Sequence, residues 1–360
     1  MPSVSSAPTK AIITGGAGFI GCNAAARRLR RGERVVVADN LFRRGADKNL
    51  AWLREQAEHS GSDAAGRLIH APVDVRDAGA LNALFDEHAD AGVVLHLAGQ
   101  VAVTTSVTNP REDFEINALG SFNVLEAARR LAKLRAFLYT STNKVYGGME
   151  DVGVMVRDGR YAYGSPELTH GVPETQPLDF HSPYGCSKGA ADQYTIDYAR
   201  IYGLPTVCLR QSAIYGERQM GVEDQGWVSW FCIRAAQGKP ITIYGDGMQV
   251  RDVLWIDDVL DAYDAAIERI DRVKGQAYNL GGGPRNVLSI GDVPKLLERK
   301  LGRPLDVSYA EWRPGDQRVF IADIRKSERE LGWAPKVGPE EGVGRLLAWV
   351  RANLDLFADL

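Results

Sequence analysis

The sequence predicts an α/β protein with a doubly wound parallel sheet (a Rossmann fold) and a smaller C-terminal lobe of mixed structure. Short, continuous apolar runs alternate with amphipathic helical stretches through the first 210 residues. Strands of this kind are buried on both faces, as in a parallel sheet covered by helices. A glycine-rich turn follows the first run, and the alternation breaks down after residue 212. Ligands of such sheets bind at the carboxyl ends of the strands, so we expect the functional site there.

The apolar runs that we expect to be strands are 11–14, 35–39, 67–71, 93–98, 136–141 and 206–210. We assign residues 9–212, together with about 251–276, to the main domain, because the helical stretch 255–270 should pack back onto it. The remaining residues, 213–250 and 277–360, hold shorter elements separated by glycine-rich turns. We expect them to form the smaller, substrate-binding lobe.

Composition excludes several classes of partner. The chain has 360 residues and a formal net charge of −3, so it lacks a basic field that would attract nucleic acid. No apolar run approaches the roughly 18 residues of a membrane span, and we expect residues 1–8 to be a disordered leader. The cysteines stand far apart, which indicates a reduced, cytoplasmic protein without a disulfide framework or a metal site: Cys22, Cys186, Cys208 and Cys232.

The glycine turn predicts a dinucleotide site. Gly15, Gly18 and Gly21 follow the first strand and open a helix, so the backbone can approach a pyrophosphate at the helix N-terminus. Asp39 ends the next strand, where a carboxylate binds the adenosine ribose hydroxyls and repels a 2′-phosphate. These features favour NAD over NADP. Arg43 and Arg44 stand close enough to leave a 2′-phosphate open, unless they belong to a solvated loop.

Two further strand ends point to the same site. Asp74 in "VDVRD" could reach the adenine edge, and "HLAGQ" places small residues against the middle of the cofactor. We interpret His96, inside a buried strand, as a packed core histidine. The long Gly/Pro-rich stretch 147–180 has little periodicity, and we expect a surface loop that covers the site.

A tyrosine and a lysine form the candidate catalytic pair. Tyr184 and Lys188 stand at i and i+4, hence on one face of a helix that Pro183 helps to start. A free phenol has a pKa near 10, and an ammonium one turn away together with a positive nicotinamide ring would lower that pKa. A bare YxxxK is often a surface pair. Combined with the glycine turn and a hydroxyl at the fifth strand end, it becomes a strong signal for a catalytic pair.

The three motifs together resemble the extended short-chain dehydrogenase/reductases (the NAD-dependent epimerase/dehydratase superfamily), which modify nucleotide sugars. In that superfamily the hydroxyl four residues before the Tyr of "VYG", here Thr142, assists proton transfer. The resemblance covers nearly the whole chain and is closest to the CDP-tyvelose (CDP-paratose) 2-epimerases. The segments that carry it are "HLAGQVAVTTS", "DFEIN", "STNKVYG", "LDFHSPYGCSKGAADQY", "DQGW" and "DQRVF".

This resemblance implies an epimerase that keeps NAD bound and inverts C2 of a CDP-hexose through a 2-keto sugar. Tyr184 would exchange the proton of the C2 hydroxyl, Thr142 would orient it, and Lys188 would lower the pKa of Tyr184 and bind the nicotinamide ribose. CDP-paratose, CDP-glucose or both remain open as substrates. The expected NAD-binding residues are Gly15, Ala17, Gly18, Phe19, Ile20, Gly21, Asp39, Asn40, Asp74, Val75, Leu97, Ala98, Gln100, Asn117, Thr140, Tyr184, Lys188 and Gln211.

Asn143 and Lys144 separate this chain from the related sugar-nucleotide 4,6-dehydratases, which carry two carboxylates at these positions. An amide and a protonated lysine cannot replace an acid/base pair, so we expect oxidation of a hydroxyl without elimination of water. Asn143 is either a substrate contact or a turn-forming residue, and Lys144 is either solvated or paired locally.

The nucleotide end of the substrate is assigned by resemblance. Tyr244 could stack on a pyrimidine, while Arg251 and Arg313 match arginines that contact the diphosphate. The resemblance also implies a homodimer, formed by the helix that carries Tyr184 and by the one near 113–133. Two other functions stay open: a UDP-hexose 4-epimerase, which would use the same triad, and an NAD-binding sensor or scaffold without turnover, a class that commonly lacks the Tyr or the Lys.

Overall fold

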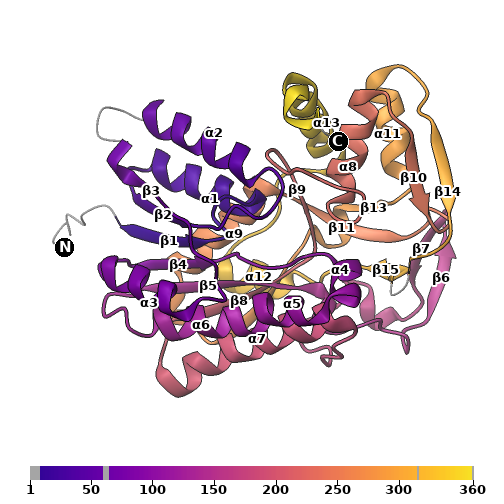
Figure 1. Cartoon of the computed structure of the whole chain (residues 1–360). Coiled ribbons are helices and arrows are strands. Elements are labelled where there is room, and N and C mark those ends of the chain that lie inside the picture. The colour runs from indigo at the N-terminus through magenta and orange to yellow at the C-terminus, as the bar shows by residue number, and fades with distance from the viewer. Residues whose placement is uncertain (1–8, 60–64, 314–315, 359–360) are drawn as a thin grey trace.

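A seven-stranded parallel sheet forms the centre of the protein. The computed structural model describes residues 9–59, 65–313 and 316–358, so the expected leader lies outside the described residues. The strands of the main sheet are β1 (Lys10–Thr14), β2 (Arg34–Ala38), β3 (Leu68–Ala71), β4 (Val93–His96), β5 (Ala136–Thr142), β8 (Thr206–Gln211) and β12 (Gln276–Leu280). They pair in parallel in the order β12-β8-β5-β4-β1-β2-β3 (Figure 1). This sheet confirms the predicted Rossmann fold.

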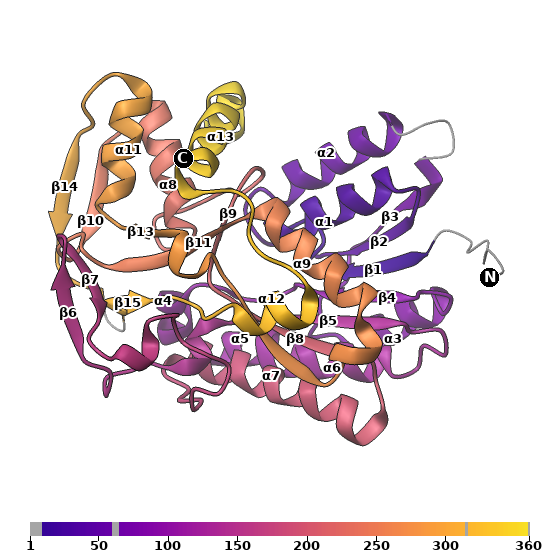
Figure 2. The same cartoon turned by 180° about the vertical axis from the view of Figure 1, so that it is seen from behind.

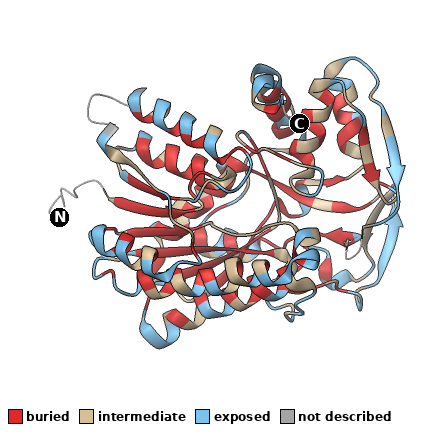
Figure 3. Cartoon of the chain, in the orientation of Figure 1, coloured by how far each residue is buried: buried red, intermediate tan, exposed pale blue. Residues whose placement is uncertain are grey.

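Both faces of the sheet are covered by helices, which explains the continuous apolar runs. Ile12 and Ile13 are neighbours on β1 and both are fully buried, but they belong to two different hydrophobic clusters on opposite faces. One face carries α1 (Phe19–Arg30), α2 (Ala46–His59) and α9 (Ile256–Glu268). The other carries α3 (Ala78–Glu87), α6 (Gly120–Ala128) and α7 (Ser182–Tyr202). Figure 3 shows the buried strands between these two helical layers.

Strand β12 lies at one edge of the main sheet, although the sequence-based division assigns residues 277–360 to the smaller lobe. It pairs with β8 from Gln276 opposite Val207 to Leu280 opposite Gln211. α12 (Arg325–Leu331) packs against it. The run "QAYNL" contains polar residues that read as a turn, but their side chains are bonded: the Tyr278 hydroxyl donates to Glu330 and the Asn279 amide to the Val172 carbonyl.

The smaller lobe combines two short sheets with helices (Figure 2). One sheet holds β9 (Ala213–Tyr215), β11 (Val250–Trp255), β13 (Val287–Ser289) and β15 (Val319–Phe320), and the other pairs β10 (Ile241–Tyr244) with β14 (Val307–Ala310). Its longer helices are α8 (Trp227–Gln237), α11 (Asp292–Leu301) and α13 (Pro339–Ala352).

Short helical elements are distributed over the whole chain. The α-helical ones are α4 (Val103–Thr108), α5 (Pro110–Phe114) and α10 (Ile270–Val273), and η2 (Glu115–Leu119) is a π-helical turn. The 3₁₀ turns are η1 (Ala65–Arg67), η3 (Asn143–Tyr146), η4 (Pro166–Leu168), η5 (Gly283–Arg285) and η6 (Leu354–Phe357).

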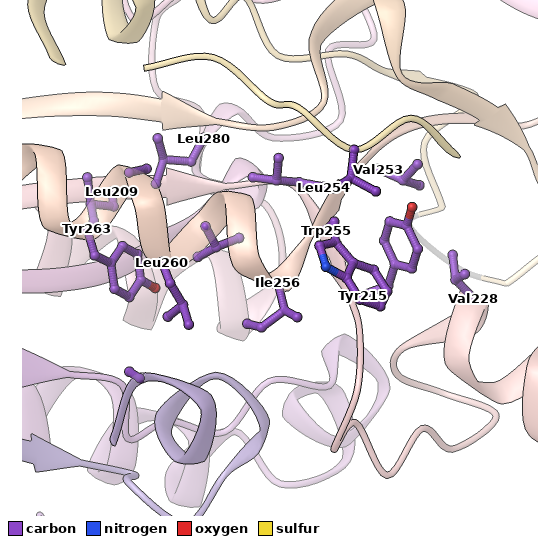
Figure 4. Packing of buried hydrophobic residues seen from close by; sticks show 14 of the residues in the cluster. Leu209, Tyr215, Val228, Val253, Leu254, Trp255, Ile256, Leu260, Tyr263 and Leu280 are labelled. Carbon is purple, nitrogen blue, oxygen red and sulfur yellow. The ribbon is translucent and has the colours of Figure 1, made fainter. Parts of the chain in front are cut away.

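A continuous apolar core joins the two parts of the molecule. Figure 4 shows Trp255 at the end of β11 beside Tyr215, with Val228 from the smaller lobe on one side and Leu260 from α9 on the other. The rings of Tyr215 and Trp255 meet edge to face with centroids 5.5 Å apart. These residues all belong to one buried cluster, so the smaller lobe is anchored to the main domain by packing.

The stretch 147–180 is more ordered than the loop that its composition predicts. It contains a β-hairpin of β6 (Val154–Arg157) and β7 (Arg160–Tyr163). Asp158 and Gly159 form its turn with φ angles of 51° and 71°, the left-handed values that two-residue hairpin turns require. The Asp-Gly pair between two β-prone runs was the signal for this hairpin, and the abundance of glycine around it obscured that signal.

All four cysteines are free thiols, and Cys186 is the exposed one. Within the described residues, no helix has the length and apolar character needed to cross a membrane. No cluster of three or more His, Cys, Asp or Glu side chains in that part of the chain could hold a metal ion.

Candidate active site

A cavity of about 510 Å³ lies at the carboxyl ends of the main-sheet strands. It is lined by every residue expected to bind NAD except Asn117, including the glycine turn, Asp39, Tyr184 and Lys188. Asn117 is buried behind the cavity wall, where its side chain accepts from the Gln100 backbone amide at 2.9 Å and donates to the Gln100 carbonyl at 3.0 Å. It therefore supports a lining residue and has no direct access to the cavity.

The glycine turn forms a cradle that only glycine permits. Gly15 has a φ of 66°, and a Cβ there would lie 2.6 Å from the backbone nitrogen of Ala98. A Cβ on Gly21 would overlap the carbonyl oxygen of Gly15. Gly18 caps the N-terminus of α1 in an extended conformation, so the free amides of the first helical turn face the cavity. This cradle fits a dinucleotide pyrophosphate.

The adenosine end of the cavity is acidic. The Asp39 carboxylate accepts hydrogen bonds from the backbone amides of Ala17 at 2.9 Å and Leu41 at 2.8 Å, which holds both oxygens at the cavity wall. Asp74 accepts from Asn40 at 2.9 Å, and its bond with Arg76 lowers the pKa of Asp74. Fixed carboxylate oxygens at this place suit the ribose hydroxyls of NAD.

Arg43 lies in an exposed loop, as its sequence context suggested, and it also lines the cavity. Its guanidinium donates to the side chain of Gln225 on the opposite wall. Desolvation of its guanidinium at the cavity wall lowers the pKa of Arg43, against the opposing effects of Tyr184 and Asp39. Arg43 therefore places positive charge near Tyr184.

Tyr184 is buried and hydrogen-bonds with Thr142, so the structure brings the strand-end hydroxyl to the phenol as predicted. The predicted lowering of the Tyr184 pKa is not found in the protein alone. Burial raises it to about 12, opposed by Thr142 and Arg43 and assisted by the Asp113 carboxylate. The Lys188 ammonium donates to the Thr140 carbonyl at 2.6 Å and lies 4.3 Å from the Tyr139 ring centroid. Burial also lowers the pKa of Lys188 to about 8.

A buried ion pair fixes the helix that carries Tyr184 and Lys188. Asp192, one turn further along α7, binds Arg210 of β8 at 3.0 Å and accepts from Ser141 of β5 at 2.7 Å. The Arg210 guanidinium also donates to the Tyr146 hydroxyl at 3.1 Å. Sequence reasoning missed this pair, although an arginine inside the buried run "TVCLRQ" and an aspartate on the Tyr-Lys face of α7 were available signals.

His96 is the core histidine that the sequence predicts. It is fully buried, and its two ring nitrogens bond with the hydroxyls of Thr14 at 2.7 Å and Ser121 at 2.8 Å. Burial lowers its pKa to about 3. A neutral histidine satisfied on both nitrogens beneath the glycine turn is a structural residue.

The predicted nucleotide contacts lie in the smaller lobe and are not among the residues that line the cofactor cavity. Arg313 stacks on Tyr244, with its guanidinium carbon 3.9 Å from the ring centroid, and pairs with Asp224 at 3.1 Å. Arg251 is separate from this pair and binds Asp316 at 2.6 Å. Both arginines are thus held by carboxylates of the chain itself.

Asn143 and Lys144 begin the 3₁₀ turn η3 directly after Thr142. The Asn143 side-chain oxygen accepts from the Thr142 hydroxyl at 3.3 Å, and that hydroxyl accepts from the Lys144 backbone amide at 3.2 Å. Lys144 lines a second cavity of about 470 Å³. Its pKa is lowered to about 8 by burial and by the nearby Arg251, against the effect of Asp316.

Comparison with known proteins identifies the family that this geometry indicates. Residues 11–281 match the NAD dependent epimerase/dehydratase family. The chain therefore belongs to this family, which confirms the resemblance seen in its motifs, and its cofactor is NAD.

Individual relatives agree with this assignment. The chain is 43% identical over 345 residues to a CDP-paratose 2-epimerase from Salmonella typhi, covering 94% of this chain and 98% of the relative. A UDP-glucose 4-epimerase from Thermotoga maritima, solved with UDP-glucose, superimposes with a TM-score of 0.79 at 29% identity, covering 96% of this chain and 100% of its own. The Thermus thermophilus UDP-glucose 4-epimerase, solved in complex with NAD, gives a TM-score of 0.77 at 30% identity with the same coverages.

Proposed function

We propose that the protein is a nucleotide-sugar epimerase that inverts C2 of a CDP-hexose. The observation that carries the proposal is a hydroxyl-redox site without elimination machinery: Tyr184 and Thr142 meet beside the cofactor cavity, while an amide and an ammonium follow Thr142. The assignment of C2 and of cytidine is supported by the 43% identity to the CDP-paratose 2-epimerase over nearly the whole chain.

In this proposal the side chains of the chain handle a proton. The phenolic oxygen of Tyr184 takes the proton of the C2 hydroxyl and returns it after the sugar has presented its other face. The Thr142 hydroxyl orients that oxygen through their hydrogen bond. Bound NAD supplies the hydride acceptor and donor that no side chain provides. Because burial raises the pKa of Tyr184 to about 12, the phenol releases its proton only with positive charge nearby. Arg43 already opposes this rise, and the ammonium of Lys188, one turn further along the helix that carries Tyr184, is a second cation on the cavity suited to provide that charge.

The cofactor residues have distinct roles in the same scheme. The glycine turn and the N-terminus of α1 would hold the pyrophosphate, Asp39 the adenosine ribose, and Lys188 the nicotinamide ribose. An epimerase consumes no net NAD, so we infer that the cofactor stays bound between turnovers and that the protein purifies with NAD. Denaturing the purified protein and assaying the supernatant for NAD(H) tests this part.

A substrate panel tests the proposed reaction. The protein would be incubated with CDP-glucose, CDP-paratose, UDP-glucose and UDP-galactose, and the configuration at C2 and C4 followed by NMR. We expect inversion at C2 of a CDP-sugar only. Inversion at C4 of a UDP-sugar would instead establish the second candidate, a UDP-hexose 4-epimerase, which the two superimposed solved structures favour. Retention of both configurations with NAD bound would favour a non-catalytic NAD-binding protein.

We further propose a cytoplasmic homodimer. The four free thiols are consistent with a reducing compartment. Exposed apolar side chains gather on α5, η2, α6 and α7, on one side of the sheet (Figure 1): Phe114, Leu119, Phe122, Tyr194, Ile201 and Tyr202. Such a cluster on neighbouring helices suits burial against the same face of a second copy. Sedimentation at micromolar protein tests it, and a monomer there would contradict the dimer.

A further inference from the structure

The second cavity lies next to the cofactor cavity, and both continue along the same chain segments. Ala102 lines the first cavity and Val103 the second. In the same way, Ser182 at the start of α7 lines the second cavity, and Tyr184 two residues later lines the first. The catalytic tyrosine therefore stands at the boundary between the two spaces, and a sugar that reaches Tyr184 from the side of the smaller lobe would occupy the second cavity.

Lys144 brings a poorly satisfied cation into this second space. Its ammonium can donate three hydrogen bonds. Among the described residues, the bond it donates goes to the side-chain oxygen of Gln317 at 3.3 Å, a long contact for a charged donor. Gln317 is itself held in place, because its amide donates to the Gly147 carbonyl at 2.6 Å. The ammonium thus keeps donor capacity directed at the cavity that it lines.

The carboxylate nearest to Lys144 is occupied by another cation. Asp316 pairs with Arg251 at 2.6 Å, and in the described part of the chain Lys144 has no carboxylate partner. A buried donor without a full set of partners is costly, so a ligand oxygen that reached it would gain a charge-assisted hydrogen bond. Lys144 stands two residues after Thr142, and its backbone amide donates to the Thr142 hydroxyl at 3.2 Å, so its segment adjoins the residue that faces Tyr184.

We propose that Lys144 is the specificity-determining residue for the hexose: its ammonium donates to a hydroxyl oxygen of the sugar ring in the second cavity. This inference rests on the proposed function insofar as the ligand is a nucleotide sugar. In this proposal the diphosphate is bound by Arg251 and Arg313, because their planar guanidinium groups suit phosphate geometry. A hydrogen bond to the hexose adds affinity for the nucleotide sugar and leaves affinity for the free nucleotide unchanged.

The test measures how much the hexose adds to binding. Lys144→Met keeps most of the apolar stem and removes the charge, and Lys133→Met, at an exposed lysine on the far edge of the main domain, is the matched control. Titration calorimetry with CDP, CDP-glucose, UDP and UDP-glucose gives the ratio of dissociation constants between each nucleotide and its sugar. We expect Lys144→Met to weaken the binding of CDP-glucose roughly 10- to 100-fold and to leave CDP within about twofold. Lys144→Arg, which keeps a cation, should restore part of the loss.

Each outcome separates the inference from the proposed function. If Lys144→Met binds CDP-glucose as the unmodified protein does, or weakens CDP equally, the assignment of Lys144 to the hexose is wrong while the epimerase proposal stands. If the unmodified protein prefers UDP-glucose and the variant loses that preference, Lys144 is confirmed and the CDP assignment fails. If the unmodified protein binds neither sugar better than its nucleotide, both are overturned. Circular dichroism melting verifies folding, and Lys144→Gln replaces the Met variant if that one unfolds.

Discussion

The cofactor side and the sugar side of this protein are built in different ways. The cofactor cavity is formed by strand ends and short motifs, and its cradle, Gly15 to Gly21, is seven consecutive residues of one turn and helix. The second cavity collects Lys144, His181 and Gln317, which stand far apart in the chain. Its neighbouring arginines, Arg251 and Arg313, are paired with Asp316 and Asp224. The comparison teaches that the glycine cradle is preformed, whereas under the proposed function a diphosphate that reached these two arginines would first have to displace the carboxylates that hold them.

Gly21→Ala should have the largest effect of these substitutions, because it should prevent NAD binding. A Cβ at this position would overlap the Gly15 carbonyl oxygen, so either the turn or the start of α1 must shift. We expect loss of bound NAD, measured by its release on denaturation. Gly66→Ala, where a Cβ would meet nothing within 4 Å, is the control and should retain NAD. Retention of NAD by the Gly21 variant would show that the cradle tolerates a side chain.

Tyr184→Phe should leave NAD in place and reduce turnover by roughly 10²–10⁴-fold, the usual contribution of general acid/base catalysis. The change removes only the oxygen that bonds with Thr142 and leaves the ring in its buried position. Thr142→Val should be milder, because a water molecule can replace part of its hydrogen bonding. Turnover by the Phe variant close to that of the unmodified protein would mean that another group exchanges the proton.

His96 predicts a pH dependence of stability for the cofactor side. The pKa of His96 is about 3 in the folded protein and near 6.5 in the unfolded chain. Between these pH values the unfolded chain therefore binds a proton that the folded protein does not. This contribution to stability is complete above pH 6.5 and is lost as the pH falls towards 3, on the order of 4–5 kcal/mol over the window. The free energy of unfolding, measured with urea across this pH range, should depend less steeply on pH in His96→Gln than in the unmodified protein. The substitution His170→Gln, at an exposed histidine, should leave this slope unchanged. Equal slopes for all three would contradict the burial of a neutral His96.

Asp224→Asn should give the smallest effect, and this effect is a gain in affinity for a nucleotide diphosphate. The pair joins an exposed Asp224 to a partly buried Arg313, and a pair open to solvent on one side contributes about 0–1 kcal/mol. Freed from the carboxylate, Arg313 should bind a nucleotide diphosphate up to about fivefold more tightly, measured by calorimetry with CDP. Asp271→Asn, at an exposed aspartate of α10, is the control. Weaker binding of CDP by the Asp224 variant would mean that the pair positions Arg313 for the ligand.

The sequence predicted the cofactor side well because its signals are local. The glycine spacing, Asp39 and the Tyr184–Lys188 pair each depend on a few neighbouring residues, and the structure places them on one cavity. Features that join residues far apart in the chain were missed because no local pattern marks them. Partners such as Arg210 for Asp192 are not visible from spacing.

Electrostatic balances were equally out of reach of the sequence. The YxxxK motif suggests a lowered phenol pKa, but the burial of Tyr184 raises its pKa to about 12 in the protein alone. Lys144 looked like a solvated or locally paired residue, and its place on a cavity follows from the packing of the smaller lobe against η3. Burial is a property of the whole fold, so no short segment reports it.

The central claim, transient oxidation at C2 without elimination, is tested most directly with deuterium. CDP-glucose or CDP-paratose labelled with deuterium at C2 would be converted by the protein, and the product analysed by NMR. The account predicts that the label stays at C2 of the epimer and that a reaction in D₂O adds no deuterium there, because the same hydride returns to the same carbon. Loss of the label, solvent deuterium at C2 or C3, or a 4-keto-6-deoxy product would contradict it.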